Sequence, residues 1–520
     1  METLSDIFSR LIANMSRFLS ELNFSELFSG LDLSRLKDVV LYDARSPLLF
    51  NTGLFLLLFI FFMIIYKAMR GHNRLRMVFV ILFSLYFYYK SSAWCCFILL
   101  GICISDYLLG RWLGQMKTDW KRRAIVFLNV FINVGMLVYF KYLNLLIEAF
   151  NNFVSRDFDV LDIVLPAGIS FFTFRSISYI VDIYRRDMEP ARNFIDYCFF
   201  LTFFPPLLAG PVVRAKDMLP QIYARPEATR EQISRGLMLI MFGLVKKVIV
   251  ADYISGNFVD RIFDNPGLYS GFENLMGCIG FTLQLYCDFS GYSDMAIGIA
   301  LLLGYEFKDN FNAPFKAQNP SDFWRRWHIS LSTWLRDYLY IPMGGNRKGK
   351  FRTYFNNFMT MVIGGLWHGA SWMYILWGAY HGLLLAIHKM FKRVWRLPEA
   401  LKGNFVIRFV NMAVTFSLVV AGFALFRAPS LSTIGDMATQ MWNDFHIDVA
   451  PQFIESYLLI VAAIAAGYFM HFTPKSWTTG TIRFYNAMPA VIQSIFLAAL
   501  LFIVIQSRQS ELVPFVYLQY

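Results

Sequence analysis

Apolar segments long enough to cross a lipid bilayer recur along almost the whole of this 520-residue chain. A transmembrane helix needs about 20 mostly apolar residues, and in lipid every backbone polar group must be bonded internally. Only 16% of the residues are charged, against about a quarter in a soluble protein. The apolar segments lie near residues 48–66, 76–90, 93–113, 124–147, 161–184, 195–213, 236–252, 276–304, 354–388, 405–426, 453–471 and 488–506. The sequence therefore predicts an all-α polytopic membrane protein with about ten to twelve transmembrane helices, plus interfacial and re-entrant helices.

Two of these segments are poor candidates for simple spans. The segment near 195–213 contains FFPPLLAGPVVR, in which prolines and glycine interrupt a helix, so we expect this backbone to be buried in protein or to line a cavity. The segment near 354–388 contains many glycines and predicts either one long helix or a bent pair.

The net charge of +12 does not indicate a nucleic-acid partner, because the basic residues lie between apolar segments. The positive-inside rule predicts that four basic blocks face the cytoplasm, whereas the acidic loops face outward. At the start of the chain, apolar residues at helical spacing predict an amphipathic helix on the membrane surface. These apolar residues are Ile7, Leu11, Met15, Phe18, Leu19 and Leu22.

The stretch WRRWHISLSTWLRDYLYIPMGG, residues 324–345, places costly polar groups among aromatic ones. Ser321 can cap a helix that begins here, and His328 would lie at the edge of its apolar stripe. The stripe comprises Trp324, Trp327, Leu331, Trp334, Leu335 and Tyr338. Taken alone, this pattern is typical of an interfacial helix with its histidine turned towards the protein.

A second histidine lies within GGLWHGASWMYILWGAYHG, residues 364–382. His368 has no acidic or basic neighbour for a dozen positions on either side, and a buried ionisable group in a membrane segment indicates function. The alternative is a neutral histidine that only bonds to a neighbouring helix. The glycine pairs at 365 and 369, and at 378 and 382, predict close helix packing.

Two further polar clusters fall in apolar segments, around Arg175 and around Asp288 and Asp294. We expect an ion pair between Arg175 and one of the two aspartates, in a structural scaffold rather than in catalysis. The six cysteines lack metal-ligand spacing, so the sequence predicts no metal site.

Together these stretches resemble the membrane-bound O-acyltransferase (MBOAT) family, and in particular its branch of bacterial alginate O-acetyltransferase membrane proteins. The resemblance covers roughly residues 160–390, in order. It rests on LPAGISFFTFRSISYIVDIYRR, FFPPLLAGPVVR, YCDFSGYSDMAIGIALLLGYEFKDNFNAPF, DFWRRWHISLSTWLRDYLYIPMGGNRKG and GGLWHGASWMYILWGAYHG.

The resemblance implies a ring of helices around a tunnel, with His368 as the catalytic histidine and His328 as the second functional residue. His368 would take the proton from an acceptor hydroxyl, and His328 would orient the donor or stabilise the developing negative charge. The donor site would draw on Trp324, Arg325, Arg326, Arg347 and Lys348. The alternative is that these basic residues face lipid headgroups and that Trp324 only packs against other side chains. The implied regions are an amphipathic extension over 1–47, N-terminal transmembrane helices over 48–159, a catalytic core over 160–390 and C-terminal transmembrane helices over 391–520, all in one structural domain.

The implied reaction needs no permanently bound cofactor. Its donor would be acetyl-coenzyme A or another acyl thioester, and its acceptor a cell-envelope polysaccharide, reached with an extracytoplasmic partner enzyme at a bacterial inner membrane. The alternatives are D-alanyl transfer from a carrier protein to teichoic acid, and a transporter of a lipid-linked glycan that performs no chemistry.

Overall fold

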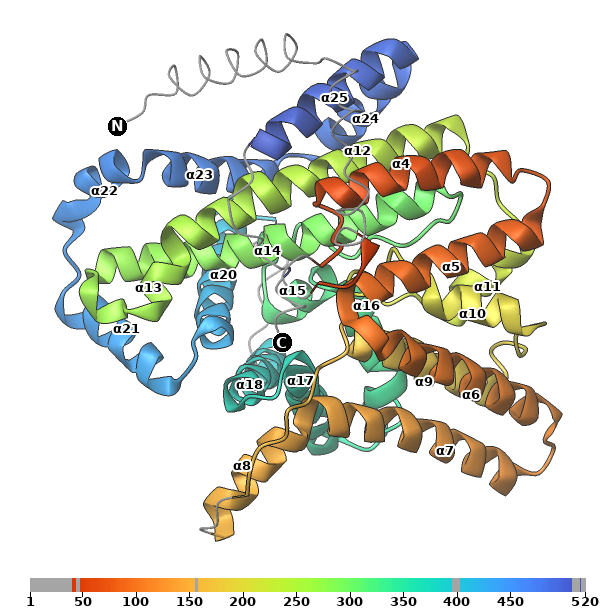
Figure 1. Ribbon diagram of the computed structural model, residues 1–520. Helices are drawn as coiled ribbons and strands as arrows, with labels where there is room; N and C mark the ends of the chain where they lie inside the picture. Colours follow the sequence, from red (N-terminus) through yellow and green to blue (C-terminus); the bar gives the residue numbers. More distant parts are fainter. Residues whose placement is uncertain (1–39, 44–46, 155–157, 395–402, 507–514, 516–520) are drawn as a thin grey trace.

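The computed structural model describes residues 40–43, 47–154, 158–394, 403–506 and 515, and all regular structure within them is helical (Figure 1). The amphipathic helix expected within residues 1–47 lies outside this described part except at 40–43 and 47, so it stays a prediction.

The first half of the chain forms α4 (Gly53–Ala68), α5 (Asn73–Ser92), η1 (Ala93–Cys95), α6 (Cys96–Gln115), α7 (Asp119–Leu137), η2 (Val138–Tyr142), α8 (Leu143–Val154), α9 (Ile169–Arg185), α10 (Phe194–Thr202), α11 (Ala215–Ala224), α12 (Arg230–Leu244), η3 (Val245–Asp252), η4 (Ser255–Val259), α13 (Asp260–Asp264) and η5 (Pro266–Leu268). The second half forms α14 (Gly271–Leu302), η6 (Pro314–Lys316), α15 (Pro320–Arg326), α16 (Ile329–Leu335), η7 (Arg336–Tyr340), α17 (Lys350–His368), α18 (Trp372–Val394), α20 (Phe405–Arg427), α21 (Leu431–Asn443), η8 (Ile447–Val449), α22 (Ala450–Ser456), α23 (Leu458–Phe472), α24 (Lys475–Ala487) and α25 (Ala490–Gln506).

By length and composition, three helical segments within the described residues could cross a membrane: Asn73–Gln115, Asp119–Val154 and Phe405–Arg427. A fourth candidate is a pair of helices, Ile447–Ser456 and Leu458–Phe472, bent by 97°. This number is smaller than the ten to twelve spans expected from the sequence. The difference arises because Asn73–Gln115 is one segment where the sequence suggested two, and because α4 and α25 are apolar but shorter. Between residues 160 and 390 the apolar segments fold into helices that are short or broken or that carry buried polar groups.

Helix α14 runs antiparallel beside α12 and its continuation η3 at the centre of the molecule (Figure 1). Their contact is built on two glycine pairs with the same spacing of seven residues, Gly236 with Gly298 and Gly243 with Gly291. A Cβ added at Gly236 would lie 2.7 Å from the carbonyl oxygen of Gly298, and one added at Gly243 would lie 2.5 Å from that of Gly291. Small residues thus let the two backbones approach as in membrane helix pairs.

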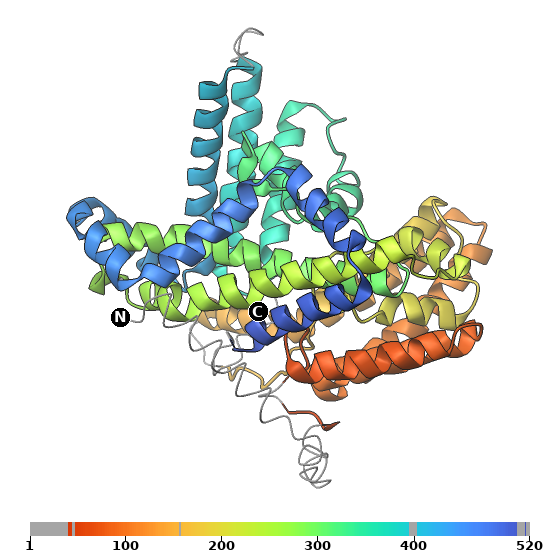
Figure 2. The same ribbon diagram turned by 90° about the horizontal axis from the view of Figure 1, so that it is seen from above.

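The segment near 354–388 is a bent pair, one of the two forms that its glycines allow. Helix α17 ends at His368, Gly369 is extended, and α18 starts at Trp372. The backbones of the two helices are in close contact at the expected glycines, since a Cβ at Gly378 or at Gly382 would lie 3.0 Å from a backbone Cα of α17. Figure 2 shows that α18 also runs beside α20, and this pair projects from the rest of the protein.

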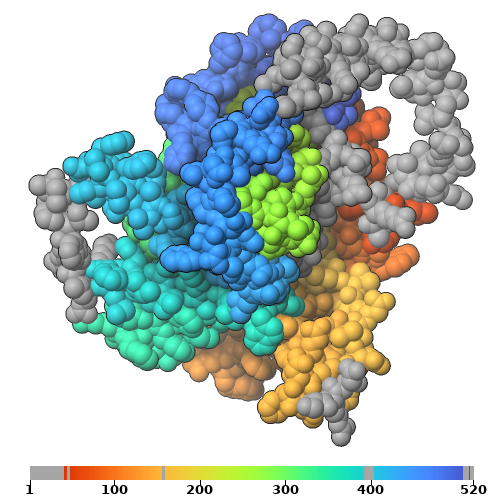
Figure 3. Space-filling view, turned by 90° about the vertical axis from the view of Figure 1, so that its left-hand side faces the viewer, coloured from red at the N-terminus to blue at the C-terminus, as the bar shows by residue number. Residues whose placement is uncertain are grey.

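The proline-rich segment is buried, as the sequence predicted. Helix α10 ends at Thr202, and residues 203–213 continue without a helix while every one of them is buried. Seen from the side in Figure 3, segments far apart in sequence share one face: the C-terminal helices (blue) flank residues near α13 (lime), above residues of the first third of the chain (orange).

Candidate active site

His368 is the last residue of α17, and its backbone is held by a helix from the first third of the chain. The ammonium of Lys141 donates to the carbonyl oxygens of Trp367 (2.9 Å) and His368 (3.0 Å). The hydroxyl of Tyr142 donates to the carbonyl oxygen of Leu366 at 2.8 Å. A cation and a hydroxyl therefore cap the negative end of α17 and fix the position of His368.

His328 lies at a break in the stretch that we expected to form one continuous helix. Helix α15 ends at Arg326, and α16 starts at Ile329. His328 has a φ of +42°, a left-handed conformation that is rare outside glycine and that concentrates at functional sites. The expected cap is also different, because Asn319 rather than Ser321 accepts the hydrogen bond at the start of α15.

The two histidines meet at the indole of Trp367. The ring of Trp367 lies 4.9 Å from that of His368 and 6.1 Å from that of His328, centroid to centroid. Both histidines are buried, with 6% and 0% of their surface exposed. Phe174 of α9 stacks between Trp367 and Trp334 and so ties α9, α16 and α17 together at this point.

A small network of polar groups fixes the side of His328 that faces the loop 305–319. Nδ1 of His328 lies 3.2 Å from Oδ1 of Asn310. Oδ1 of Asn310 also accepts from the backbone N–H of Ser330 (3.2 Å) and from its hydroxyl (2.8 Å). The amide nitrogen of Asn310 donates to Ser293 of α14 at 3.0 Å. Burial of this group in a low dielectric favours the neutral imidazole.

The expected ion pair of Arg175 with Asp288 or Asp294 is wrong. Lys247 bonds to Asp288 and Lys246 to Asp294, each at 2.6 Å, whereas Arg175 donates to the carbonyl oxygen of Phe200. The reason is the close approach of α14 to η3, which continues α12. A Cβ at Gly291 would lie 3.4 Å from the backbone nitrogen of Lys247, so both lysines reach the aspartates three residues to either side of Gly291.

The residues expected to bind the donor occupy different environments. Arg325, Arg347 and Lys348 are exposed, and Arg326 pairs with Asp322 at 3.1 Å within α15. Trp324 packs edge-on against Trp377 and His381, with ring centroids 5.7 and 5.2 Å away. The donor role of these five residues stays a prediction.

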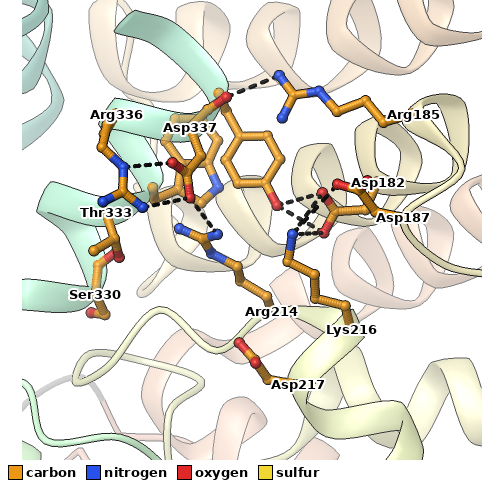
Figure 4. Close-up of polar contacts among 12 residues, drawn as sticks. Asp182, Arg185, Asp187, Arg214, Lys216, Asp217, Ser330, Thr333, Arg336 and Asp337 are labelled. Carbon is orange, nitrogen blue, oxygen red and sulfur yellow. Dashed lines mark hydrogen bonds and ion pairs between the residues drawn. The ribbon is translucent and has the colours of Figure 1, made fainter. Parts of the chain in front are cut away.

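A polar cavity of about 310 Å³ opens beside the network around His328, and Ser330 lies in its wall. Figure 4 shows that charged side chains converge here from α9, α11, η7 and the segment before α11. The carboxylate of Asp337 binds two guanidinium groups, those of Arg214 (2.8 Å) and Arg336 (2.7 Å). Lys216 faces Asp182 at 3.4 Å. The second terminal nitrogen of Arg214 has no hydrogen-bond partner among the described residues.

Sequence comparison with known proteins places this chain in a family. A profile of the membrane-bound O-acyltransferase family matches residues 191–424. A probable alginate O-acetylase of Pseudomonas aeruginosa is 41% identical over 408 residues, which cover 76% of this chain and 75% of that protein. The chain belongs to the membrane-bound O-acyltransferase family.

Two other relatives indicate the breadth of the chemistry in this family. A peptidoglycan O-acetyltransferase of Helicobacter pylori is 35% identical, over 71% of this chain and 76% of its own. A teichoic acid D-alanyltransferase of Bacillus subtilis is 28% identical, over 50% of this chain and 68% of its own. This MBOAT protein is accordingly a membrane O-acyltransferase with an all-α fold.

Sequence reasoning missed several residues that hold the site together. Lys246 and Lys247 were detectable, because two lysines inside an apolar segment are costly and predict buried partners. Lys141 carried a weaker form of the same signal. Asn310 and Ser330 had none, because an asparagine in a loop and a serine in a helix are ordinary in sequence.

Proposed function

We propose that this protein transfers an acyl group, most simply acetyl, from a cytoplasmic thioester such as acetyl-coenzyme A to a cell-envelope polysaccharide. The observation that carries this proposal is the meeting of two buried histidines, His328 and His368, at Trp367 in an acyltransferase of this family. We take the donor to be a substrate, so the reaction needs no resident cofactor.

The proposed chemistry is a proton-assisted displacement at the thioester carbonyl. One histidine removes the proton from the acceptor hydroxyl as its oxygen attacks the carbonyl carbon. The other donates a hydrogen bond to the negative charge that develops on the carbonyl oxygen. The C–S bond then breaks, and the departing thiolate takes up the proton. Burial suits both histidines to this task, because it keeps their imidazoles neutral before the reaction.

The polar cavity beside Ser330 is our candidate for the donor entrance. Two guanidinium groups share the single carboxylate of Asp337, so this part of the wall is locally positive, although the whole lining has four basic and four acidic residues. An anionic phosphate of the donor could bond to Arg336, whose guanidinium is the more exposed of the two in this wall. Ser330 in the wall of this cavity bonds to Asn310, which in turn faces Nδ1 of His328.

The acceptor side of the proposal rests on the relatives, which are named for the acetylation of alginate and of peptidoglycan. A polymer acceptor favours an extracytoplasmic partner enzyme. We propose that the protein spans the inner membrane of a bacterium several times. D-alanyl transfer from a carrier protein is the second candidate, because Arg325, Arg347 and Lys348 are exposed basic residues to which an acidic carrier could bind. The transporter alternative is weakened by membership of an enzyme family.

The test is thioester consumption by the full-length protein in nanodiscs with radiolabelled acetyl-coenzyme A. We compare wild type, His368→Ala and His328→Ala with His381→Ala as the matched control, because His381 is also a buried histidine in an aromatic cluster. We expect turnover to fall about 100-fold or more for the first two variants and to persist in the control. Equal turnover in wild type and in both site variants would overturn the proposal. Activity only with a D-alanyl carrier protein would select the second candidate.

A further inference from the structure

Asn310 is anchored so firmly that the orientation of its side-chain amide can be deduced. The side chain is 1% exposed, and the backbone N–H of Ser330 points at one of its terminal atoms from 3.2 Å. A backbone N–H can only donate a hydrogen bond, so the atom it faces must be the oxygen. The amide nitrogen then faces the hydroxyl of Ser293, to which it can donate at 3.0 Å.

This orientation determines which nitrogen of His328 carries the hydrogen. Nδ1 of His328 lies 3.2 Å from the amide oxygen of Asn310, and an amide oxygen can only accept. Two facing lone pairs would repel each other, so Nδ1 must carry the hydrogen. In a neutral imidazole the other nitrogen, Nε2, then carries the lone pair.

The hydroxyl of Ser330 does not offer an alternative partner to Nδ1. It accepts from the backbone N–H of Val212 at 2.9 Å and donates its single hydrogen to Asn310 at 2.8 Å. Nδ1 of His328 lies farther from this hydroxyl, at 3.5 Å. The strained backbone of His328 is held in the same way, because the N–H of Ile329 bonds to the backbone oxygen of Asn310 at 2.9 Å.

We propose that Asn310 is a positioning residue that holds His328 in the Nδ1–H tautomer, so that Nε2 of His328 is the proton acceptor in acyl transfer. This inference rests on the proposed function and assigns one of its roles. The proton of the acceptor hydroxyl passes to Nε2 as the oxygen–carbon bond forms. It leaves Nε2 for the thiolate as the C–S bond breaks. His368 is then the group left to stabilise the oxyanion, which reverses the division of roles implied by the resemblance.

The experiment compares Asn310→Ala and Asn310→Asp with Asn274→Ala in the full-length protein in nanodiscs. Asn274 of α14 is the matched control. Its side chain is 0% exposed, close to the 1% of Asn310, and its amide nitrogen donates to backbone oxygens near Pro266. Each variant is assayed for kcat and KM with acetyl-coenzyme A. The tautomer of His328 is read from ¹⁵N NMR of protein labelled with ¹⁵N-histidine. The signal of His328 is assigned as the one missing from the spectrum of His328→Gln.

We expect Asn310→Ala to lower kcat about 10- to 100-fold with little change in KM, and to mix the two tautomers of His328. Asn310→Asp keeps an acceptor oxygen opposite Nδ1 and should restore the tautomer and most of kcat. A wild-type spectrum with hydrogen on Nε2 would overturn the inference even if the variants failed to fold. So would a loss in Asn310→Ala no larger than in Asn274→Ala. If wild type consumed no thioester at all, the proposed function would fail, whereas the tautomer would still be measured.

Discussion

The buried group of Lys247, Asp288 and Asp252 allows a sharp test of how this membrane protein is held together. The ammonium of Lys247 lies 2.6 Å from Asp288 and 2.8 Å from Asp252. The three side chains are 0%, 4% and 10% exposed. One ammonium group therefore neutralises two buried carboxylates. Removing the ammonium and removing one carboxylate should lower the free energy of unfolding by different amounts.

Replacing Lys247 with Met leaves two carboxylates buried with no ammonium between them. Breaking a buried ion pair in this way costs about 3–5 kcal/mol. Replacing Asp288 with Asn leaves Lys247 paired with Asp252 and removes the charged hydrogen bond between Lys247 and Asp288, at a cost of about 1–3 kcal/mol. The double variant should cost less than the sum of the two, because the carboxylate that suffers most from the loss of Lys247 is also removed.

The assay is the midpoint of thermal unfolding in detergent, followed by tryptophan fluorescence, for both single variants and the double variant. A parallel cycle with Arg175→Met and Asp288→Asn is the control, and it should be additive to within about 0.5 kcal/mol because these residues do not pair. Our reasoning is refuted if Asp288→Asn destabilises as much as Lys247→Met, or if Arg175 couples to Asp288.

Three further predictions concern packing and charge. Gly298→Ala should lower the unfolding midpoint, at a cost of about 1–3 kcal/mol, because its Cβ would lie 2.5 Å from the carbonyl oxygen of Gly236; Gly135→Ala, which meets no atom within 4 Å, should leave the midpoint unchanged or raise it. An equal loss in both would show that α12 and α14 do not touch there. Trp334→Ala should cost about 3–5 kcal/mol in the same assay, because its ring stacks 3.8 Å from that of Phe174, and a change below 1 kcal/mol would contradict this packing. Partial burial alone would raise the pKa of Asp337, but the guanidinium groups of Arg336 and Arg214 hold that pKa below its usual range. Its stabilisation is thus complete above the unfolded value, about 4, and is lost as the pH falls through the folded value. The difference in unfolding midpoint between wild type and Asp337→Asn should therefore be constant above about pH 5 and should shrink in acid. A difference that grows in acid would contradict the ion pairs of Asp337 with Arg336 and Arg214.

The amino-acid sequence by itself determined the class of this protein. Apolar segments with few charges allow only helices in a membrane, and proline and glycine mark where those helices stop. The break after His368 and the buried non-helical segment 203–213 follow from such local signals. The motifs around His328 and His368 identified the family, because their residue types and order are specific over more than 200 positions.

Only the tertiary structure decided which polar groups meet. Arg175 and Asp288 were reasonable partners by charge. However, the glycines between α14 and the helix formed by α12 and η3 allow a close approach that pairs Lys247 with Asp288. The helix that the pattern predicted through His328 is broken. There the backbone oxygen of Asn310 accepts from the N–H of Ile329, and its side-chain oxygen faces the ring of His328. Helix formation depends on neighbours a few residues apart, which a sequence displays. Ion pairs and histidine tautomers depend on atoms brought together from distant parts of the chain, which only the fold can specify.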